Sequence, residues 1–243
     1  MRNDEFSESL RKERNVAMSI HVAEDVLSQD VQEPSDRDVD DDWLYFWRDY
    51  EGKVSAEELQ ELWGRVLAGE VKNPGTYSVR TLDFLKVLSR EEAELISKAA
   101  QFVIDGRIFR GKDEFLEESG LILPQMLHLQ DIGVLSGLES LGFKATYTSI
   151  KPDCFYLGLV ASNRILLIEG EDTNKEAEAE VYLVTSIGRE VLKLASFKVN
   201  EGYLKSVAKD YVKKGFKVSV ADWTWVSDRE GRYSNRIEIT DNA

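Results

Sequence analysis

Apolar residues between positions 42 and 103 recur at the spacing of one helix face, which predicts a run of packed helices. Trp43, Phe46, Trp47 and Tyr50 stand at i, i+3, i+4 and i+7, the pattern of an amphipathic helix. The stretch that follows repeats the pattern at Leu59, Leu62, Trp63, Val66 and Leu67. Because the connections between stretches are short, we expect successive helices to pack as neighbours.

Capping residues stand where these helices are expected to begin and end. Asp41 and Asp42 precede the first helix, where carboxylates accept hydrogen bonds from free N–H groups. Ser55 and Glu58 have the spacing of a capping box for the second helix. The remaining caps and breaks are Gly52, Pro74-Gly75, Ser78, Ser89 and Glu92.

Two groups of residues in these helices invite a functional interpretation, and packing explains both more simply. The aromatic group is Trp43, Trp47 and Trp63. Large rings at helical spacing bury much apolar area, so we expect core residues there. The polar group is Arg65, Glu70, Ser78 and Arg80. It flanks the connection between Gly69 and Pro74, and we expect a salt bridge or cap that holds this connection.

Residues 4–28 predict one more helix, ahead of an acidic linker at 29–42. The helix has a loose apolar stripe, formed by Leu10, Val16, Ile20, Ala23 and Leu27. In the linker, Asp36, Asp38 and Asp40 alternate as at the start of an EF-hand loop. Asp41 then replaces the required glycine and Trp47 the required bidentate glutamate. We therefore expect a solvated linker without calcium.

The stretch 105–113 partly matches a phosphate-binding P-loop. Gly106, Gly111 and Lys112 have the glycine and lysine spacing, but Asp113 stands where a hydroxyl must bind Mg²⁺. A predicted helix also precedes the stretch where the motif needs a strand. We expect a short extended piece at 107–110 and no nucleotide site.

Two predicted helices lead into a region of strand composition that begins after residue 150. Helices are expected at 113–119 and 124–135, with Pro124 in the favoured first position. Residues 155–160 and 164–168 form a predicted hairpin around Ser162-Asn163. An acidic loop (169–180), a strand (181–184) and a helix (186–195) should follow. Two helices, a hairpin, a strand and a helix are typical of a winged-helix arrangement.

The last 45 residues predict a helix and two strands, with the main basic cluster of the chain. The helix covers 202–213 and ends at Gly215, and the strands cover 216–226 and 233–239. The cluster is Lys205, Lys209, Lys213, Lys214 and Lys217. A solvated helix face is the simpler interpretation. The alternative is a binding patch for an acidic partner, which includes the chain's own acidic N-terminal part.

These elements predict an α+β fold. We expect an N-terminal helical bundle in residues 1–104 and an α+β domain in residues 105–243. The second domain would consist of a winged-helix-like region at 113–195 and a small αββ unit at 199–240.

Charge and composition exclude several classes of protein. Apolar residues make up 42% and charged residues 31% of the 243 residues, an ordinary composition for a globular protein. No apolar run reaches the roughly 20 residues that a membrane-spanning helix needs. The single cysteine, Cys154, excludes an internal disulfide, so we expect a cytoplasmic protein.

The net charge of −14 argues against nucleic acid as a partner, because phosphates repel an acidic surface. More than half of the excess lies in residues 1–42, which hold 5 basic and 13 acidic side chains. The remainder of the chain is only mildly acidic. We therefore expect a protein partner first and leave an oligomer open.

Catalytic constellations are not found in the sequence. His21 and His128 lie on separate predicted helices, and with one cysteine they cannot assemble a zinc site of Cys and His ligands. The nucleophile-elbow motif of α/β-hydrolases does not occur. We expect no catalytic residues, no metal and no cofactor.

The chain resembles a bacterial family known as domain of unknown function 2806. The likeness covers most of residues 10–220. Its best stretches are Val54-Ser55-x-Glu57-Glu58, Leu62-Trp63-x-Arg65-x-Leu67-Ala68-Gly69-Glu70, Pro74-Gly75-x-x-Ser78-x-Arg80-Thr81-Leu82 and Leu88-Ser89-x-x-Glu92-Ala93. The resemblance implies a bacterial or phage-borne protein, often from mobile or defence-related regions. It implies no activity, cofactor or catalytic residue.

Three functions are consistent with these observations. The first is a non-enzymatic interaction or scaffold protein of a bacterial or phage system, because caps and packing explain nearly every distinctive residue. The second is a nucleic-acid-binding regulator that uses the winged-helix-like region and the lysines from Lys205 to Lys217. The third is an acidic mimic of nucleic acid, formed by residues 1–42 and the acidic loop, that binds a basic protein.

Overall fold

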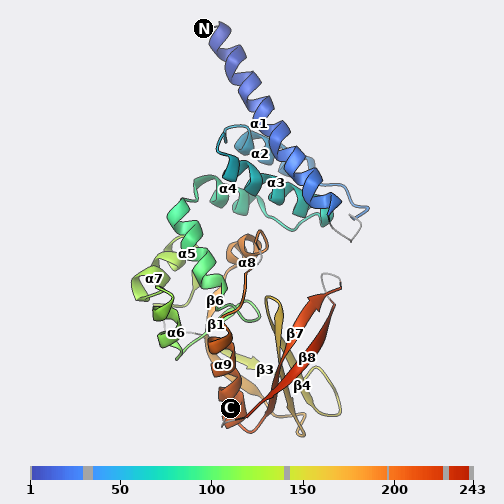
Figure 1. The fold of residues 1–243 in the computed structure, drawn as a ribbon, viewed down its shortest axis with the longest axis vertical. Helices are drawn as coiled ribbons and strands as arrows, with labels where there is room; N and C mark the ends of the chain where they lie inside the picture. Colours follow the sequence, from blue (N-terminus) through green and yellow to red (C-terminus); the bar gives the residue numbers. More distant parts are fainter. Residues whose placement is uncertain (1, 30–34, 140–142, 196, 227–229, 241–243) are drawn as a thin grey trace. The chain divides into compact units, whose positions relative to one another are not determined.

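The computed structural model describes residues 2–29, 35–139, 143–195, 197–226 and 230–240 of the chain (Figure 1). The chain divides into two compact units, Met1–Leu88 and Ser89–Ala243. The sequence predicted a boundary between independently folding domains after residue 104. A division by contacts does not test independent folding, so that boundary stays a prediction. Each unit is described by itself.

The described residues of the N-terminal unit form helices α1 (Arg2–Ser28), α2 (Asp41–Glu51), α3 (Glu57–Lys72) and α4 (Val79–Val87). The cap of α2 is Asp40, whose carboxylate accepts from the backbone N–H of Trp43 at 2.9 Å. Asp41 and Asp42, predicted to precede this helix, are its first two residues. Ser78 caps α4 by accepting from the N–H of Thr81.

The predicted capping box of Ser55 and Glu58 does not form. Helix α3 begins at Glu57 after Ala56, which has no side chain that can cap. The hydroxyl of Ser55 instead accepts from the side-chain amide of Asn15 at 3.4 Å. The Ser55 hydroxyl, which the sequence predicted to cap α3, therefore binds Asn15 of α1 instead.

The tryptophans form the core of the N-terminal unit. Trp43, Trp47 and Trp63 are all buried. The indole N–H of Trp43 donates to the carbonyl of Tyr77 at 2.7 Å, and that of Trp47 donates to the carbonyl of Trp63 at 3.0 Å. The indole N–H groups of Trp43 and Trp47 thus both have hydrogen-bond acceptors inside the core, as buried indoles require.

Glu70 holds the turn between α3 and α4. One carboxylate oxygen accepts from the N–H of Gly75 at 2.5 Å and the other from the N–H of Tyr77 at 2.8 Å. Gly75 has φ +94°, which glycine adopts without steric cost. A single buried carboxylate therefore closes the connection that leads into α4.

A polar cluster is buried where α1 meets the end of α2 and the start of α3. The hydroxyl of Ser19 donates to Oε1 of Glu51 at 2.7 Å, while Oε2 of Glu51 is buried with no hydrogen-bond partner among the described residues. The amide of Asn15 donates to the carbonyl of Gly52 at 3.0 Å. Burial raises the pKa of Glu51 above its ordinary value, and the bond from Ser19 offsets part of this rise.

We expect Glu51→Gln to flatten the pH dependence of stability. A carboxyl group with a raised pKa in the folded state binds its proton more tightly there than in the unfolded chain. The free energy of unfolding of the natural protein should therefore fall as the pH rises from about 4.5 through the folded pKa. Chemical denaturation between mildly acidic and alkaline pH measures this, with Glu61→Gln as a control on the exposed face of α3. Equal slopes for the natural protein and Glu51→Gln would contradict the prediction.

Glu70→Ala should destabilise the N-terminal unit by about 3 kcal/mol, because two charge-assisted hydrogen bonds to backbone N–H groups disappear together. Glu70→Gln keeps one good acceptor and should lose about half of that. Urea denaturation followed by tryptophan fluorescence measures the difference. A loss below about 0.5 kcal/mol for the alanine variant, the size expected of an unremarkable surface change, would show that Glu70 does not hold the turn.

The C-terminal unit begins with helix α5 (Arg90–Ala100), which carries the predicted capping box of Ser89 and Glu92. Its first sheet consists of β1 (Arg107–Phe109), β2 (Leu135–Ser136), β3 (Phe143–Tyr147) and β6 (Ala177–Val184). Strand β6 pairs antiparallel with each of the other three. Three short helices belong to the same unit, α6 (Asp113–Glu118), α7 (Leu123–Asp131) and α8 (Ser186–Leu192).

The second sheet is antiparallel and has the order β4-β5-β7-β8. Its strands are β4 (Phe155–Ala161), β5 (Arg164–Gly170), β7 (Lys217–Trp225) and β8 (Gly231–Ile239). Helix α9 (Glu201–Lys213) packs on this sheet beside β7 (Figure 1). The predicted hairpin is present, with Ser162 at φ +55° in its turn.

The α+β fold class is confirmed, with helices first and strands after them. Several details of the sequence prediction differ from the structure, and the predicted helix at 124–135 ends at Asp131, with Leu135 in β2. Residues 177–180 of the predicted acidic loop belong to β6, and β2 and β3 were not predicted. The winged-helix arrangement is not confirmed, because the β4–β5 hairpin and β6 lie in different sheets. Within the ranges that the structure describes, no helix has the length and apolar character to cross a bilayer.

Candidate functional site: an aromatic groove on an open sheet face

The two faces of the second sheet are covered differently. Residues that alternate along β4 point to opposite faces, and Phe155, Leu157 and Leu159 are buried while Tyr156 and Val160 are partly exposed. The ring of Phe155 lies 4.8 Å from that of Phe216, which in turn contacts Tyr211 of α9. The Phe155 face is therefore the one that α9 covers. The other face is called the open face below.

A small apolar cluster lies on the open face and is covered by larger side chains of the same sheet. Ile165, Leu167 and Ala221 are buried there, packed under Tyr156, Val160 and Trp223. Large aromatic side chains thus form the outer layer over this cluster. They are positioned by strand register, since Trp223 stands opposite Tyr233 and Tyr156 stands opposite Glu169.

Four aromatic rings follow one another across the open face, and we call them the aromatic row. Trp225 packs edge-on against Trp223 with ring centroids 5.3 Å apart. Trp223 is the cross-strand neighbour of Tyr233, whose hydroxyl hydrogen-bonds to that of Tyr156. Trp225 is 52% exposed and Tyr233 is 45% exposed, so two of the rings present large apolar area to solvent.

The row ends in a cavity of about 800 Å³, called the aromatic groove below. The groove lies between the end of α5, the β4–β5 turn, the segment after α8 and the end of β7. Its described lining includes two lysines, Lys193 and Lys198, and no carboxylate. The other residues of its wall used in the argument are Ser162, Asn163, Phe197, Trp223 and Trp225.

Backbone contacts give the groove a defined wall. The N–H of Trp223 donates to the carbonyl of Asn163 at 2.8 Å, and the hydroxyl of Ser162 donates to the carbonyl of Phe197. A Cβ atom on Gly231 would stand 2.2 Å from the Trp223 ring, so only glycine leaves room for the indole at this position. The indole nitrogen of Trp223 is buried and has no acceptor among the described residues.

Positive charge stands at both ends of the aromatic row. Lys193 and Lys198 are exposed at the groove. At the far end, the ammonium of Lys151 lies 3.9 Å from the centre of the Tyr156 ring. Ser149 fixes the loop that carries it, because its hydroxyl accepts from the N–H groups of Lys151 and Tyr156, each at 3.0 Å.

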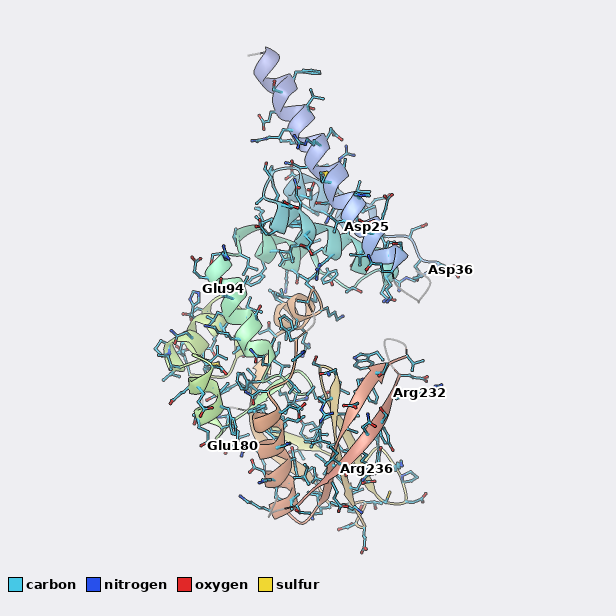
Figure 2. The ribbon with its side chains drawn as sticks, in the orientation of Figure 1. Asp25, Asp36, Glu94, Glu180, Arg232 and Arg236 are labelled. Atoms are coloured by element: carbon cyan, nitrogen blue, oxygen red, sulfur yellow. The ribbon has the colours of Figure 1, made fainter. Side chains whose placement is uncertain are left out.

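Arg236 and Glu169 form a matched pair of charges near the row. Arg236, labelled on β8 in Figure 2, donates to Glu169 and to the hydroxyl of Ser219. Burial raises the pKa of Tyr156 to about 12, and the hydrogen bond with Tyr233 adds to the shift. Tyr156 is therefore a neutral phenol at physiological pH and adds no negative charge to the surface.

The lysine cluster predicted from the sequence does not lie in the lining of the groove. Lys205 and Lys213 are exposed on α9, with Lys209 between them. The ammonium of Lys214 donates to the carbonyl of Glu178 at 2.5 Å, and Lys217 pairs with Glu238 at 3.7 Å. Two of the five lysines thus have partners within the unit.

The other polar residues singled out by the sequence form local contacts. Arg65 pairs with Glu61 one turn earlier at 2.6 Å, Arg80 is exposed, and Glu58 is exposed in the first turn of α3. His128 lies 3.4 Å from Glu92. Among the described residues, no three side chains of His, Cys, Asp or Glu are grouped so that they could hold a metal ion.

Sequence reasoning missed the groove and the aromatic row. Trp223 and Trp225 were placed correctly in a strand, where their i, i+2 spacing puts both rings on one face. That spacing, followed by a glycine that can face an aromatic ring across a hairpin, is a detectable signal. The contribution of Phe197, Lys193 and Tyr156 depends on contacts between distant parts of the chain.

The comparison with protein families decides the membership of the chain. Residues 2–208 match the family described as "Protein of unknown function (DUF2806)". The chain belongs to this family. The match covers both units and extends to α9, so it ends before β7 and β8, which carry Trp223, Trp225 and Tyr233. No curated protein and no solved structure matches the chain.

Proposed function

We propose that this DUF2806 protein is a non-enzymatic interaction protein that holds an extended anionic partner in the aromatic groove. The observation that carries the proposal is the lining of the groove, where exposed Trp225 and half-buried Trp223 and Phe197 stand beside two lysines and no described carboxylate. In a chain of net charge −14, such a surface is a local exception. It combines apolar area with positive charge, as a surface that recognises an anionic ligand does.

The setting of the proposed function is a cytoplasmic scaffold of a bacterial or phage system, in some cases related to defence. One cysteine in 243 residues supports a reducing compartment. Side chains in the described helices pack, cap or pair locally. Packing and capping thus explain the distinctive residues of the helices, which favours a binding role over a catalytic one. The two alternatives from the sequence, a winged-helix regulator and an acidic mimic, stay predictions.

Two matched charge reversals test the proposal in the intact chain. Lys193→Glu with Lys198→Glu alters the groove, while Lys205→Glu with Lys213→Glu alters α9 and changes the net charge equally. Tagged protein is used for affinity capture from a bacterial host, with and without nuclease, and bound components are quantified. We expect the groove variant to lose at least about 80% of the captured partner, equivalent to ~1 kcal/mol. The α9 variant should retain most of it.

Each alternative result has its own meaning. Equal capture by both variants and the natural protein would show that the groove is not the binding surface. Loss with the α9 variant alone would assign binding to the lysines predicted from the sequence. Circular dichroism and thermal melting of both variants establish that each one is folded.

A further inference from the structure

We propose that the aromatic groove and the aromatic row together bind single-stranded nucleic acid. This inference rests on the proposed function, because it names the anionic partner of the same surface. Its structural basis is an antiparallel sheet that is backed by a helix on one face and carries exposed aromatic rings on the other. Unpaired bases stack on rings presented in this way, and phosphates contact cations beside them.

The rings are placed to meet successive bases. Trp225 and Tyr233 are the most exposed members of the row, and Trp223 lies between them. Gly231 leaves room for the Trp223 indole beside β8, which keeps the ring within the row. Base stacking tolerates any sequence because every base has a flat face. We therefore infer binding with little sequence preference.

The cations are placed to meet the backbone at the two ends of the row. Lys193 and Lys198 flank the groove, and Lys151 stands over Tyr156 at the other end. The exposed side-chain amide of Asn163 adds a donor that can meet a base edge or a phosphate oxygen.

The acidic total does not prevent this contact. The described lining of the groove holds two lysines and no carboxylate. Exposed charges farther away than about 10 Å are largely screened at ordinary ionic strength. Binding through few cations should be moderate and strongly salt-dependent.

Base-paired duplex and acidic peptide fit the surface less well. The faces of paired bases are stacked inside the duplex, so the aromatic rings have nothing to contact there. The carboxylates of an acidic peptide can pair with the lysines, but only a peptide that also carries regularly spaced aromatic residues would offer the row flat groups to contact. The row of four rings is the feature that favours unpaired bases.

Fluorescence anisotropy with labelled oligo-dT and oligo-U of roughly twelve nucleotides tests the inference on the full chain. Trp225→Leu should weaken binding by about fivefold or more, the low end for one base stacked on one ring. Tyr45→Leu is the matched control, since Tyr45 is an aromatic residue of the N-terminal unit that is 72% exposed. Its affinity should equal that of the natural protein.

Salt dependence provides the second measurement. Between about 50 and 200 mM salt, Lys193→Glu with Lys198→Glu should reduce the slope of log K against log salt by about 1.4, or ~0.7 per lost phosphate contact. Lys205→Glu with Lys213→Glu should leave the slope unchanged. Both comparisons use folded, intact protein.

Three results would overturn the inference. One is the absence of oligonucleotide binding even at about 50 mM salt. Another is stronger binding of a labelled peptide of alternating Glu and Phe, which would make the partner an acidic protein segment. The last is equal loss for Trp225→Leu and Tyr45→Leu. In the first two cases the proposed function survives if host capture still depends on Lys193 and Lys198.

Discussion

The hydrogen bond from the N–H of Phe109 to the hydroxyl of Tyr203, at 2.6 Å, fixes the layers on which the candidate site depends. It joins α9 to the first sheet at β1, and Tyr203 is completely buried. Tyr211 of α9 contacts both Phe109 of β1 and Phe216, the residue before β7. With α9 held between the sheets, only one face of the second sheet is covered, and the aromatic side chains must cover the apolar cluster on the other face themselves.

Local signals predicted the elements of the fold because each depends on neighbouring residues. The capping box of Ser89 and Glu92 and the hairpin turn at Ser162 are of this kind. The prediction at Ser55 was wrong because Asn15, far away in sequence, contacts its hydroxyl. The same limitation applied to α1, whose predicted stripe mixed buried Val16 and Ala23 with exposed Leu10 and Ile20.

The candidate site could be predicted only in part, for the same physical reason. The i, i+2 spacing of Trp223 and Trp225 is visible in the sequence, and it is enough to place both rings on one face of a strand. Which face stays open depends on where α9 packs, and no local pattern contains that information. The lysines of the groove come from the segment after α8, and their position beside Trp225 results from the tertiary fold.

Net charge and local charge lead to opposite expectations for this protein, and distance decides between them. A net charge of −14 describes the whole chain, whereas a ligand in the groove contacts the side chains that line it. Because screening limits exposed charges to about one Debye length, Lys193 and Lys198 act on such a ligand more strongly than distant carboxylates do. The acidic remainder of the chain disfavours weak, non-specific contacts with polyanions, which is consistent with the proposed binding at the groove.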